Sequence, residues 1–404
     1  MIDWAPTIRG DGAMDREDPS TLRLLIEKPH AAGGVPIASR PDEAADVESL
    51  VAVSGGVDSS VAAAVLREKG HKIAAITLAL LSDAGDGAFG HHGEELFNGE
   101  TVSRARDAAS TLGVPLYILD AREVFASRVL DPFAREFAAG RTPNPCVWCN
   151  EHLKFGLLLR CLDMLGGRHL CTGHYARIIE NEKGVYRLFR GRDSSKDQSY
   201  FLYRLTQKEL ARVLFPLGGL EKTQVKEIAR KLGLPALGRP ESQDACFVDG
   251  RGYQAVIEDR LGTVPSPGDI VHLDGRVLGR HHGVHEFTVG QRRGLGIASG
   301  EPLYVVGIDS DTRRIMVGSA SDLERRLLFL SETSWVEGSA PGGEGLTARV
   351  RYRHEGVAAR IEDAHGNKAT ILLEEPVRGA APGQAAVLYR GDEVVGGGTI
   401  EETR

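Results

Sequence analysis

The sequence has no long apolar run: none of its hydrophobic stretches approaches the roughly 20 residues that a helix needs to span a bilayer. The N-terminus also lacks the apolar core of a secretory signal peptide and the Arg-rich, acid-poor pattern of a transit peptide. We therefore expect a soluble, cytoplasmic protein that does not enter a membrane. At 404 residues, and without a low-complexity tract, the chain should form two or three globular domains.

Cysteine is scarce and odd in number, which argues against a disulfide-stabilised secreted scaffold and leaves structural, reactive or metal-binding thiols. Cys161 and Cys171 lie among apolar residues and are predicted to pack in the core. Cys246, in ESQDACFVDG, has polar and acidic neighbours and is a poor core candidate. Cys146 and Cys149, in TPNPCVWCN, form a C-x-x-C pair that suits a metal site, a redox switch, a nucleophile with a helper, or simple packing.

A basic excess is also missing. Lys and Arg number 49 against 56 Asp and Glu, and the formal net charge is −7. This balance argues against a general polyanion-binding protein, although local basic patches on an acidic protein can still hold RNA.

Strands and helices alternate between residues 48 and 119. Continuous apolar runs such as HKIAAITLAL and VPLYILD are typical of buried parallel strands, and SSVAAAVLREKG has helical spacing. This pattern predicts an α/β domain with a parallel sheet covered on both faces. Short alternating strands near the C-terminus predict a small β-barrel. The expected divisions are an irregular N-terminal extension at 1–46, the α/β domain at 47–253, a small central domain at 254–312 and the barrel at 313–404.

A glycine-rich loop, VAVSGGVDSS at residues 51–60, connects the first of these strands to a helix. Gly55 and Gly56 allow several backbone N–H groups to point at one anion, and the helix N-terminus adds its positive dipole. Asp58 would hold Mg²⁺, which bridges phosphate oxygens. No Lys follows the glycines, so the loop is neither a Walker loop nor the dinucleotide fingerprint. The alternative is a plain glycine turn with a Ser or Asp helix cap; the whole string between strand and helix favours a phosphate site.

The string SGGVDSS resembles the PP-loop of ATP pyrophosphatases. Those enzymes cleave ATP between its α and β phosphates, adenylate a carbonyl oxygen and then displace AMP with a nucleophile. Sulfur is a strong nucleophile for that second step. Cys149 is predicted to lie at the start of the helix CNEHLKFGLLLRCLDML, where the helix N-terminal N–H groups would lower its thiol pKa.

Eight ordered blocks extend this resemblance to the tRNA-specific 2-thiouridylases, the MnmA/TrmU family. That family replaces the C2 oxygen of the wobble uridine in certain tRNAs with sulfur, using ATP and a persulfide donor. The chain is similar to the family from about residue 47 to residue 401. The blocks are SGGVDSS, GRTPNPCVWCNEHLKF, CTGHYAR, KDQSYFLYRL, ESQDACFV, FTVGQRRGLGI, RVRYRHEG and PGQAAVLYRGDEVVGGGTI.

The resemblance implies a PP-loop domain of the adenine nucleotide alpha hydrolase-like type, with ATP and Mg²⁺ as cofactors. It implies the anticodon arm of tRNA as the substrate, and a sulfur donor such as a cysteine desulfurase or sulfur-relay protein as a partner. Cys149 matches the family's nucleophile, and Cys246 matches the cysteine that carries the persulfide. The positions that match ATP-binding residues are Ala52, Val53, Ser54, Gly55, Gly56, Val57, Asp58, Ser59, Leu78 and Gly173. The positions that match residues meeting the target base or other parts of the tRNA are Asn144, Pro145, Cys146, His174, Lys196, Asp197, Gln198, Arg351, Tyr352 and Gln384.

Cys146 departs from the family pattern, because the best-known relatives have Asp three residues before the nucleophile. Two mechanisms follow. In one, the Cys246 persulfide attacks the adenylated uridine and Cys149 resolves the product as a disulfide. In the other, Cys146, Cys149 and Cys246 ligate a [4Fe–4S] cluster whose open iron delivers sulfur. We slightly favour the cluster; a structural zinc would need a fourth ligand, such as His152.

Two further classes of protein remain as alternatives. A PP-loop synthetase that acts on a small molecule would need neither RNA nor the cysteines. A non-enzymatic iron–sulfur or RNA-binding module would not need the complete loop that is present here.

Overall fold

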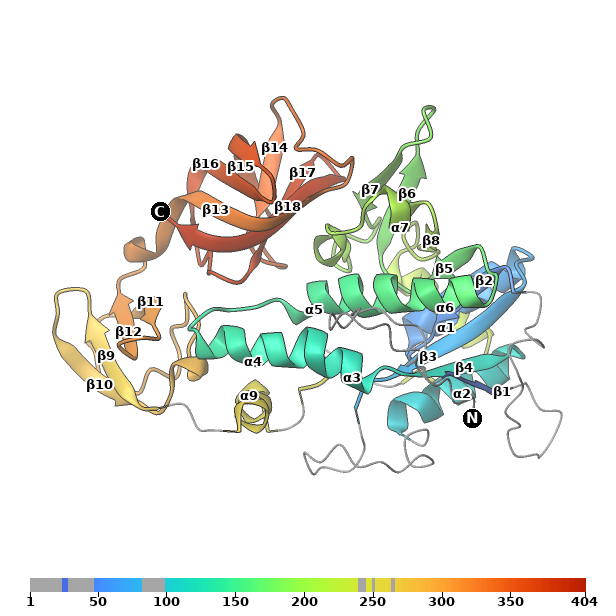
Figure 1. Ribbon diagram of the computed structural model, residues 1–404, viewed down its shortest axis with the longest axis horizontal. Helices are drawn as coiled ribbons and strands as arrows, with labels where there is room; N and C mark the ends of the chain where they lie inside the picture. Colours follow the sequence, from blue (N-terminus) through green and yellow to red (C-terminus); the bar gives the residue numbers. More distant parts are fainter. Residues whose placement is uncertain (1–23, 28–46, 82–98, 239–244, 249–250, 263–265) are drawn as a thin grey trace, which may run out of the picture.

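The computed structural model describes residues 24–27, 47–81, 99–238, 245–248, 251–262 and 266–404. An α/β domain, a small central sheet and a C-terminal barrel are distinct in Figure 1. The predicted fold class is thereby confirmed. Among the described residues, no helix has the length and apolar character needed to cross a membrane.

The sheet of the α/β domain has the strand order β1-β4-β3-β2-β5-β8. Five of its strands are parallel: β2 (Ser49–Ala52), β3 (Ile73–Ala79), β4 (Leu116–Asp120), β5 (His169–Cys171) and β8 (Val213–Leu214). Strand β1 (Leu24–Glu27) pairs antiparallel with β4 at one edge. These four residues differ from the irregular structure expected for the N-terminal extension, whose other residues up to 46 lie outside the described part.

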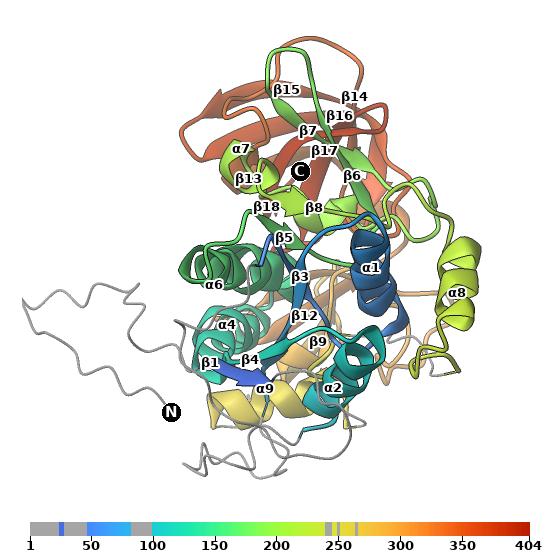
Figure 2. The same cartoon turned by 90° about the vertical axis from the view of Figure 1, so that its right-hand side faces the viewer.

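Helices cover both faces of this sheet (Figure 2). Alternate side chains of a strand point to opposite faces, so Leu50 packs in one core and Val51 in the other. Both side chains are completely buried. One face is covered by α1 (Val57–Glu68), α2 (Glu100–Leu112) and α8 (Lys222–Lys231), and the other by α4 (Asp131–Ala138) and α6 (Leu158–Met164).

The central sheet has the order β10-β9-β12-β11 and its own small core. Strands β9 and β10 form a hairpin that turns at Asp274 and Gly275. The expected boundary at residue 312 falls inside the turn between β11 and β12, and β12 pairs with both β11 and β9. The central sheet therefore extends to Gly318. Its strands are β9 (Gly268–His272), β10 (Val277–His281), β11 (Tyr304–Asp309) and β12 (Arg314–Gly318).

The C-terminal strands close into a barrel because β13 pairs with both β16 and β18. A hairpin of the α/β domain joins this sheet: β7 (Tyr186–Arg190) pairs with the start of β18, and β6 (Ala176–Glu180) pairs with β7. The two domains thus share a sheet. The barrel strands are β13 (Glu324–Trp335), β14 (Leu346–Arg349), β15 (Val357–His365), β16 (Lys368–Arg378), β17 (Ala385–Arg390) and β18 (Glu393–Thr403).

Shorter helices connect these elements. Helix α9 packs against α4, with the Phe137 and Tyr253 ring centroids 5.1 Å apart. The remaining helical segments are α3 (Arg122–Phe125), η4 (Ala126–Leu130), α5 (Pro145–Trp148), η5 (Cys149–Leu157), η6 (Ser199–Leu202), α7 (Gln207–Leu210), α9 (Tyr253–Leu261), η7 (Val284–Glu286) and η8 (Ser321–Leu323).

Candidate active site

The glycine-rich loop lies between the end of β2 and the start of α1, as predicted. Its serines hold it in shape: the Ser59 hydroxyl accepts a hydrogen bond from the Ser54 backbone N–H (3.2 Å) and donates one to the Gly56 carbonyl (3.2 Å). Gly55 has a φ of 72°, and a Cβ there would collide with Arg104 of α2. The loop therefore needs glycine at this position for both backbone angle and space.

Three neighbouring strands bring the predicted ATP positions together. Strand β2 lies between β3, which carries Leu78 near its end, and β5, which is followed by Gly173. A Cβ on Gly173 would lie 2.8 Å from the Ser59 backbone nitrogen and 2.9 Å from the carbonyl carbon of Asp58. The carboxyl ends of parallel strands form the usual ligand crevice of such sheets. The geometry thus places positions 52–59, Leu78 and Gly173 together at the carboxyl ends of these parallel strands.

Lys222 is a site residue that sequence reasoning missed. Its Nζ lies 2.7 and 2.8 Å from the two carboxylate oxygens of Asp58, and the Tyr175 hydroxyl donates a hydrogen bond of 2.8 Å to the same carboxylate. The Lys222 side chain is only 9% exposed. The carboxylate expected to hold Mg²⁺ is therefore already neutralised by an ammonium group, which a magnesium ion would have to displace. Lys222 and Asp58 are 164 positions apart, so no local pattern could have connected them.

The cysteine helix differs from the prediction. It begins at Pro145, whose fixed φ suits the first helical position, so Cys149 lies one turn inside the helix and not at its N-terminus. From Cys149 to Leu157 the helix is a π-helix, a form that is often found at functional sites. A Cβ on Gly156 would lie 2.8 Å from the Glu151 carbonyl oxygen, so this wider turn depends on glycine there.

The thiols share one nearby cation. Desolvation raises the pKa values of Cys146, Cys149 and Cys246, and the positive charge of Lys154 opposes this effect at all three. The pKa of the half-buried Cys149 is raised to about 11. The expected lowering by helix N–H groups is thus wrong, because burial outweighs it; Lys154 is the group that favours the thiolate.

The remaining two thiols behave as predicted. Cys161 and Cys171 are fully buried in the two cores of the α/β domain, and burial raises both of their pKa values. Cys146 and Cys246 are exposed at the surface, although the groups around their thiols desolvate them.

The three thiols lie near enough to act on one another electrostatically: the charge of Cys246 acts on Cys146 and Cys149, and the charge of Cys146 acts on Cys149. Within the described residues, which include Cys146, Cys149 and Cys246, no group of three or more His, Cys, Asp or Glu side chains is placed so that it could hold a metal ion. The slight preference for a [4Fe–4S] cluster stays a prediction, because this observation concerns a single metal ion.

Lys154 also connects the cysteine helix to the glycine-rich loop. Its Nζ lies 3.4 Å from Nε2 of His174, and the other ring nitrogen of His174 lies 2.7 Å from the Thr172 hydroxyl. Burial, and then the charge of Lys154, lowers the pKa of His174, so the ring is neutral and Nε2 can accept from the ammonium. His174 directly follows Gly173, which packs against the start of α1. A continuous series of contacts thus connects the residue that acts on the three thiols with the glycine-rich loop.

The predicted RNA-facing residues divide into exposed and buried groups. Arg351 is exposed, and Tyr352 lies beside Phe201 with ring centroids 4.5 Å apart. Lys196 is half-buried, and its charge acts on the Tyr352 hydroxyl, so the two lie near each other. These side chains could meet phosphate and an unpaired base.

Asp197, Gln198 and Gln384 instead serve internal contacts. Asp197 is 4% exposed and accepts hydrogen bonds from the Gly191 and Ser199 backbone and from Arg349 of the barrel (3.1 Å). Oε1 of Gln198 accepts from the Tyr175 N–H, and Nε2 of Gln384 donates to the Thr142 carbonyl (3.0 Å). Burial of the Asp197 carboxylate leaves it no direct route to RNA.

Comparison with known proteins identifies the family. Family models match residues 48–250 (tRNA methyl transferase HUP domain), 254–319 (tRNA methyl transferase PRC-barrel domain) and 325–400 (aminomethyltransferase beta-barrel domain). Over 353 residues the chain is 44% identical to the tRNA-specific 2-thiouridylase MnmA of Geobacter metallireducens, covering 87% of this chain and 96% of the relative. The chain belongs to the MnmA family. The MnmA of Moorella thermoacetica is 45% identical over 354 residues, covering 87% of this chain and 99% of the relative. The predicted family and enzyme class are therefore confirmed.

Solved structures resemble the MnmA-family chain more weakly. The U34-tRNA thiolase NcsA of Methanococcus maripaludis, solved with its [4Fe–4S] cluster, is 17% identical with a TM-score of 0.29, and the match covers 55% of this chain and 65% of that one. The NMN synthetase of Francisella tularensis is 18% identical with the same TM-score, over 54% and 79% of the two chains. Similarities of this strength carry no argument about sulfur chemistry.

Proposed function

We propose that this MnmA-family chain catalyses the ATP-dependent 2-thiolation of the wobble uridine of tRNA by persulfide chemistry. The observation that supports the proposal is a continuous series of contacts: Lys154 meets His174, and Gly173, directly before His174, packs against the start of α1. An ATP-cleaving loop beside reactive thiols suits activation of a carbonyl oxygen followed by attack of sulfur.

The first step uses the loop. The uridine C2 oxygen attacks the α-phosphorus of ATP, the bond between the α- and β-phosphates breaks, and pyrophosphate leaves. The loop N–H groups, the dipole of α1 and its serine hydroxyls bind the phosphates. Magnesium, carried by ATP, would supply further charge neutralisation near Asp58.

The second step uses Cys246 and Cys149. The terminal sulfur of a Cys246 persulfide attacks C2, and AMP leaves with the original oxygen. The Cys149 thiolate then attacks Sγ of Cys246; the sulfur–sulfur bond breaks, its electron pair leaves with the sulfur on C2, and a Cys149–Cys246 disulfide forms. A thiol reductant must return this disulfide to two thiols before the next turnover. Lys154 favours the thiolate forms at both positions.

A cysteine series tests the proposal. The protein is purified without oxygen, iron and sulfide are measured, and tRNA thiolation is assayed for Cys146→Ser, Cys149→Ser and Cys246→Ser. We expect loss of thiolation with Cys149→Ser and Cys246→Ser, retained thiolation with Cys146→Ser, and no iron. Stoichiometric iron and sulfide together with inactive Cys146→Ser would overturn the persulfide mechanism. Activity on a small molecule without RNA would identify a different PP-loop synthetase.

A further inference from the structure

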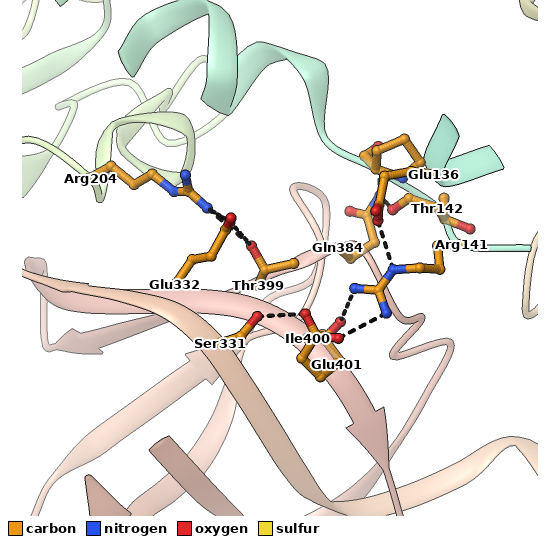
Figure 3. A network of polar contacts seen from close by, with 11 residues as sticks. Glu136, Arg141, Thr142, Arg204, Ser331, Glu332, Gln384, Thr399, Ile400 and Glu401 are labelled. Carbon is orange, nitrogen blue, oxygen red and sulfur yellow. Dashed lines mark hydrogen bonds and ion pairs between the residues drawn. The ribbon is translucent and has the colours of Figure 1, made fainter. Parts of the chain in front are cut away.

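Polar contacts from the barrel hold the segment that carries the cysteines, residues 141–151, at its beginning (Figure 3). Arg141 donates to Glu136 (2.7 Å) in its own domain and to Glu401 of β18 (3.0 Å). Ser331 of β13 in turn donates to the other Glu401 oxygen (2.5 Å). One carboxylate of the barrel is thus fixed between the segment and a second barrel strand.

The barrel also grips the backbone of this segment. The Thr142 N–H donates to the Pro382 carbonyl (2.8 Å), and the Thr142 carbonyl accepts from Nε2 of Gln384 (3.0 Å). Gly383 has a φ of 91°, and a Cβ there would lie 2.9 Å from the Thr142 nitrogen. Because the contacts are to backbone atoms, they fix the path of the chain four residues before Cys146.

A second network holds the other end of the segment. Arg204, only 11% exposed, donates to Glu151 (2.6 Å) within the π-helix. The same guanidinium donates to Glu332 (2.5 Å) and to Thr399 (3.1 Å) of the barrel. Cys146 and Cys149 therefore lie between two anchors on the same pair of barrel strands, β13 and β18.

We propose that the barrel positions Cys149 for the reaction, and that Gln384 and Glu401 are positioning residues of this clamp. The proposal rests on the proposed role of Cys149. Gln384 immediately precedes β17, which pairs with β14, and the loop after β14 carries Arg351 and Tyr352. The loop that would hold RNA and the Gln384 contact to the cysteine segment are thus connected through the paired strands β14 and β17. Attack geometry is sensitive to shifts of about 1 Å, so a loosened segment loses rate.

The clamp and an RNA contact at Gln384 predict different results. An RNA contact would be used only in the complex, and its loss would weaken tRNA binding. A clamp acts in the free protein, and its loss would expose Cys149 and lower kcat while leaving the tRNA Kd unchanged. Gln207 offers a matched control, because its Nε2 also connects the two domains: it donates to the Tyr186 carbonyl (2.7 Å) and to the Val336 carbonyl (2.9 Å), neither of which belongs to residues 141–151.

The experiment compares Gln384→Ala, Glu401→Gln and Gln207→Ala in the full chain. Three quantities are measured: the rate at which iodoacetamide alkylates Cys149 in the free protein, the tRNA Kd, and kcat for thiolation. Mass spectrometry resolves the alkylation of Cys149 from that of the other cysteines. In Gln384→Ala we expect Cys149 to be alkylated about five- to tenfold faster than in the wild type. The kcat should fall by a similar factor, and the tRNA Kd should be unchanged. Glu401→Gln, which keeps its shape, should change both in the same direction by a smaller factor, and Gln207→Ala should change neither.

Unchanged alkylation in both clamp variants would overturn the proposal, as would a weaker tRNA Kd with an unchanged kcat. A change in Gln207→Ala as large as that in Gln384→Ala would also overturn it, because the effect would then follow from domain contact in general. Alkylation is read without ATP or tRNA, so failure of the clamp is distinguishable from failure of the proposed thiolation.

Discussion

Substitution of Asp197 should strongly destabilise the free protein, even when no RNA is present. The carboxylate is 4% exposed and the guanidinium of its partner Arg349 is 11% exposed. One carboxylate oxygen accepts from the Gly191 N–H (3.2 Å) and the Ser199 N–H (3.0 Å), and the other accepts from Arg349 (3.1 Å). Asp197→Ala therefore leaves a buried cation without its carboxylate and two buried N–H groups without acceptors.

Removal of one member of a buried ion pair costs about 3–5 kcal/mol. With a denaturant slope of about 3 kcal/mol per molar urea, the midpoint of unfolding should fall by about 1 M or more. Asp197→Asn keeps an acceptor for the two N–H groups and should lose less. Asp392→Ala is the control: its carboxylate is 67% exposed and lies 3.7 Å from Arg177, so its loss should cost at most about 1 kcal/mol.

Urea unfolding followed by circular dichroism measures these differences, and filter binding measures the tRNA Kd. The reasoning would be refuted if Asp197→Ala unfolded at the wild-type midpoint while its tRNA Kd weakened. That result would indicate that Asp197 contacts RNA, as its match to the family's tRNA-binding position implies.

Three further predictions concern the nucleotide loop and the thiols. Gly173→Ala should weaken ATP binding in calorimetry and lower the free energy of unfolding by about 1–3 kcal/mol, because its Cβ would press on the start of α1. Gly219→Ala, which has open space around it, should change neither quantity. Lys222→Met should lower the free energy of unfolding by about 1.5–3 kcal/mol through loss of the charged hydrogen bonds to the loop; a wild-type melting curve would contradict this. Because burial raises the pKa of Cys149 to about 11, its alkylation rate should still rise between about pH 8 and about pH 10, as the thiolate fraction grows. Lys154→Met should raise that pKa further and slow alkylation, and a plateau below about pH 8 would show the assignment to be wrong.

The parallel sheet and its loop were predictable because their signals are local. Apolar strand runs, the helical spacing of α1 and Gly113 at the end of α2 each lie within one short window of sequence, and the structure places a left-handed glycine at that end. The barrel was predictable for the same reason, since its strands alternate and turn at short intervals.

The missed features depend on contacts between distant residues or on unusual periodicity. Lys222 meets Asp58 from 164 positions away, and β7 pairs with β18 across two domains. Lys154 follows Cys149 by five residues in a π-helix, whose hydrogen bonds join residues i and i+5. The spacing of an ordinary α-helix does not predict this wider turn. Burial raises the pKa of Cys149, whereas a helix N-terminus would lower it. Burial is likewise a property of the folded chain.

The most direct test of the central claim follows the uridine oxygen. A tRNA whose wobble uridine carries heavy oxygen at C2 is incubated with the protein, ATP and a persulfide donor, and the products are analysed by mass spectrometry. Adenylation of the carbonyl by the PP-loop site predicts 2-thiouridine in the tRNA and the heavy oxygen in AMP. Recovery of the label in inorganic phosphate, or AMP without label alongside 2-thiouridine, would contradict the account.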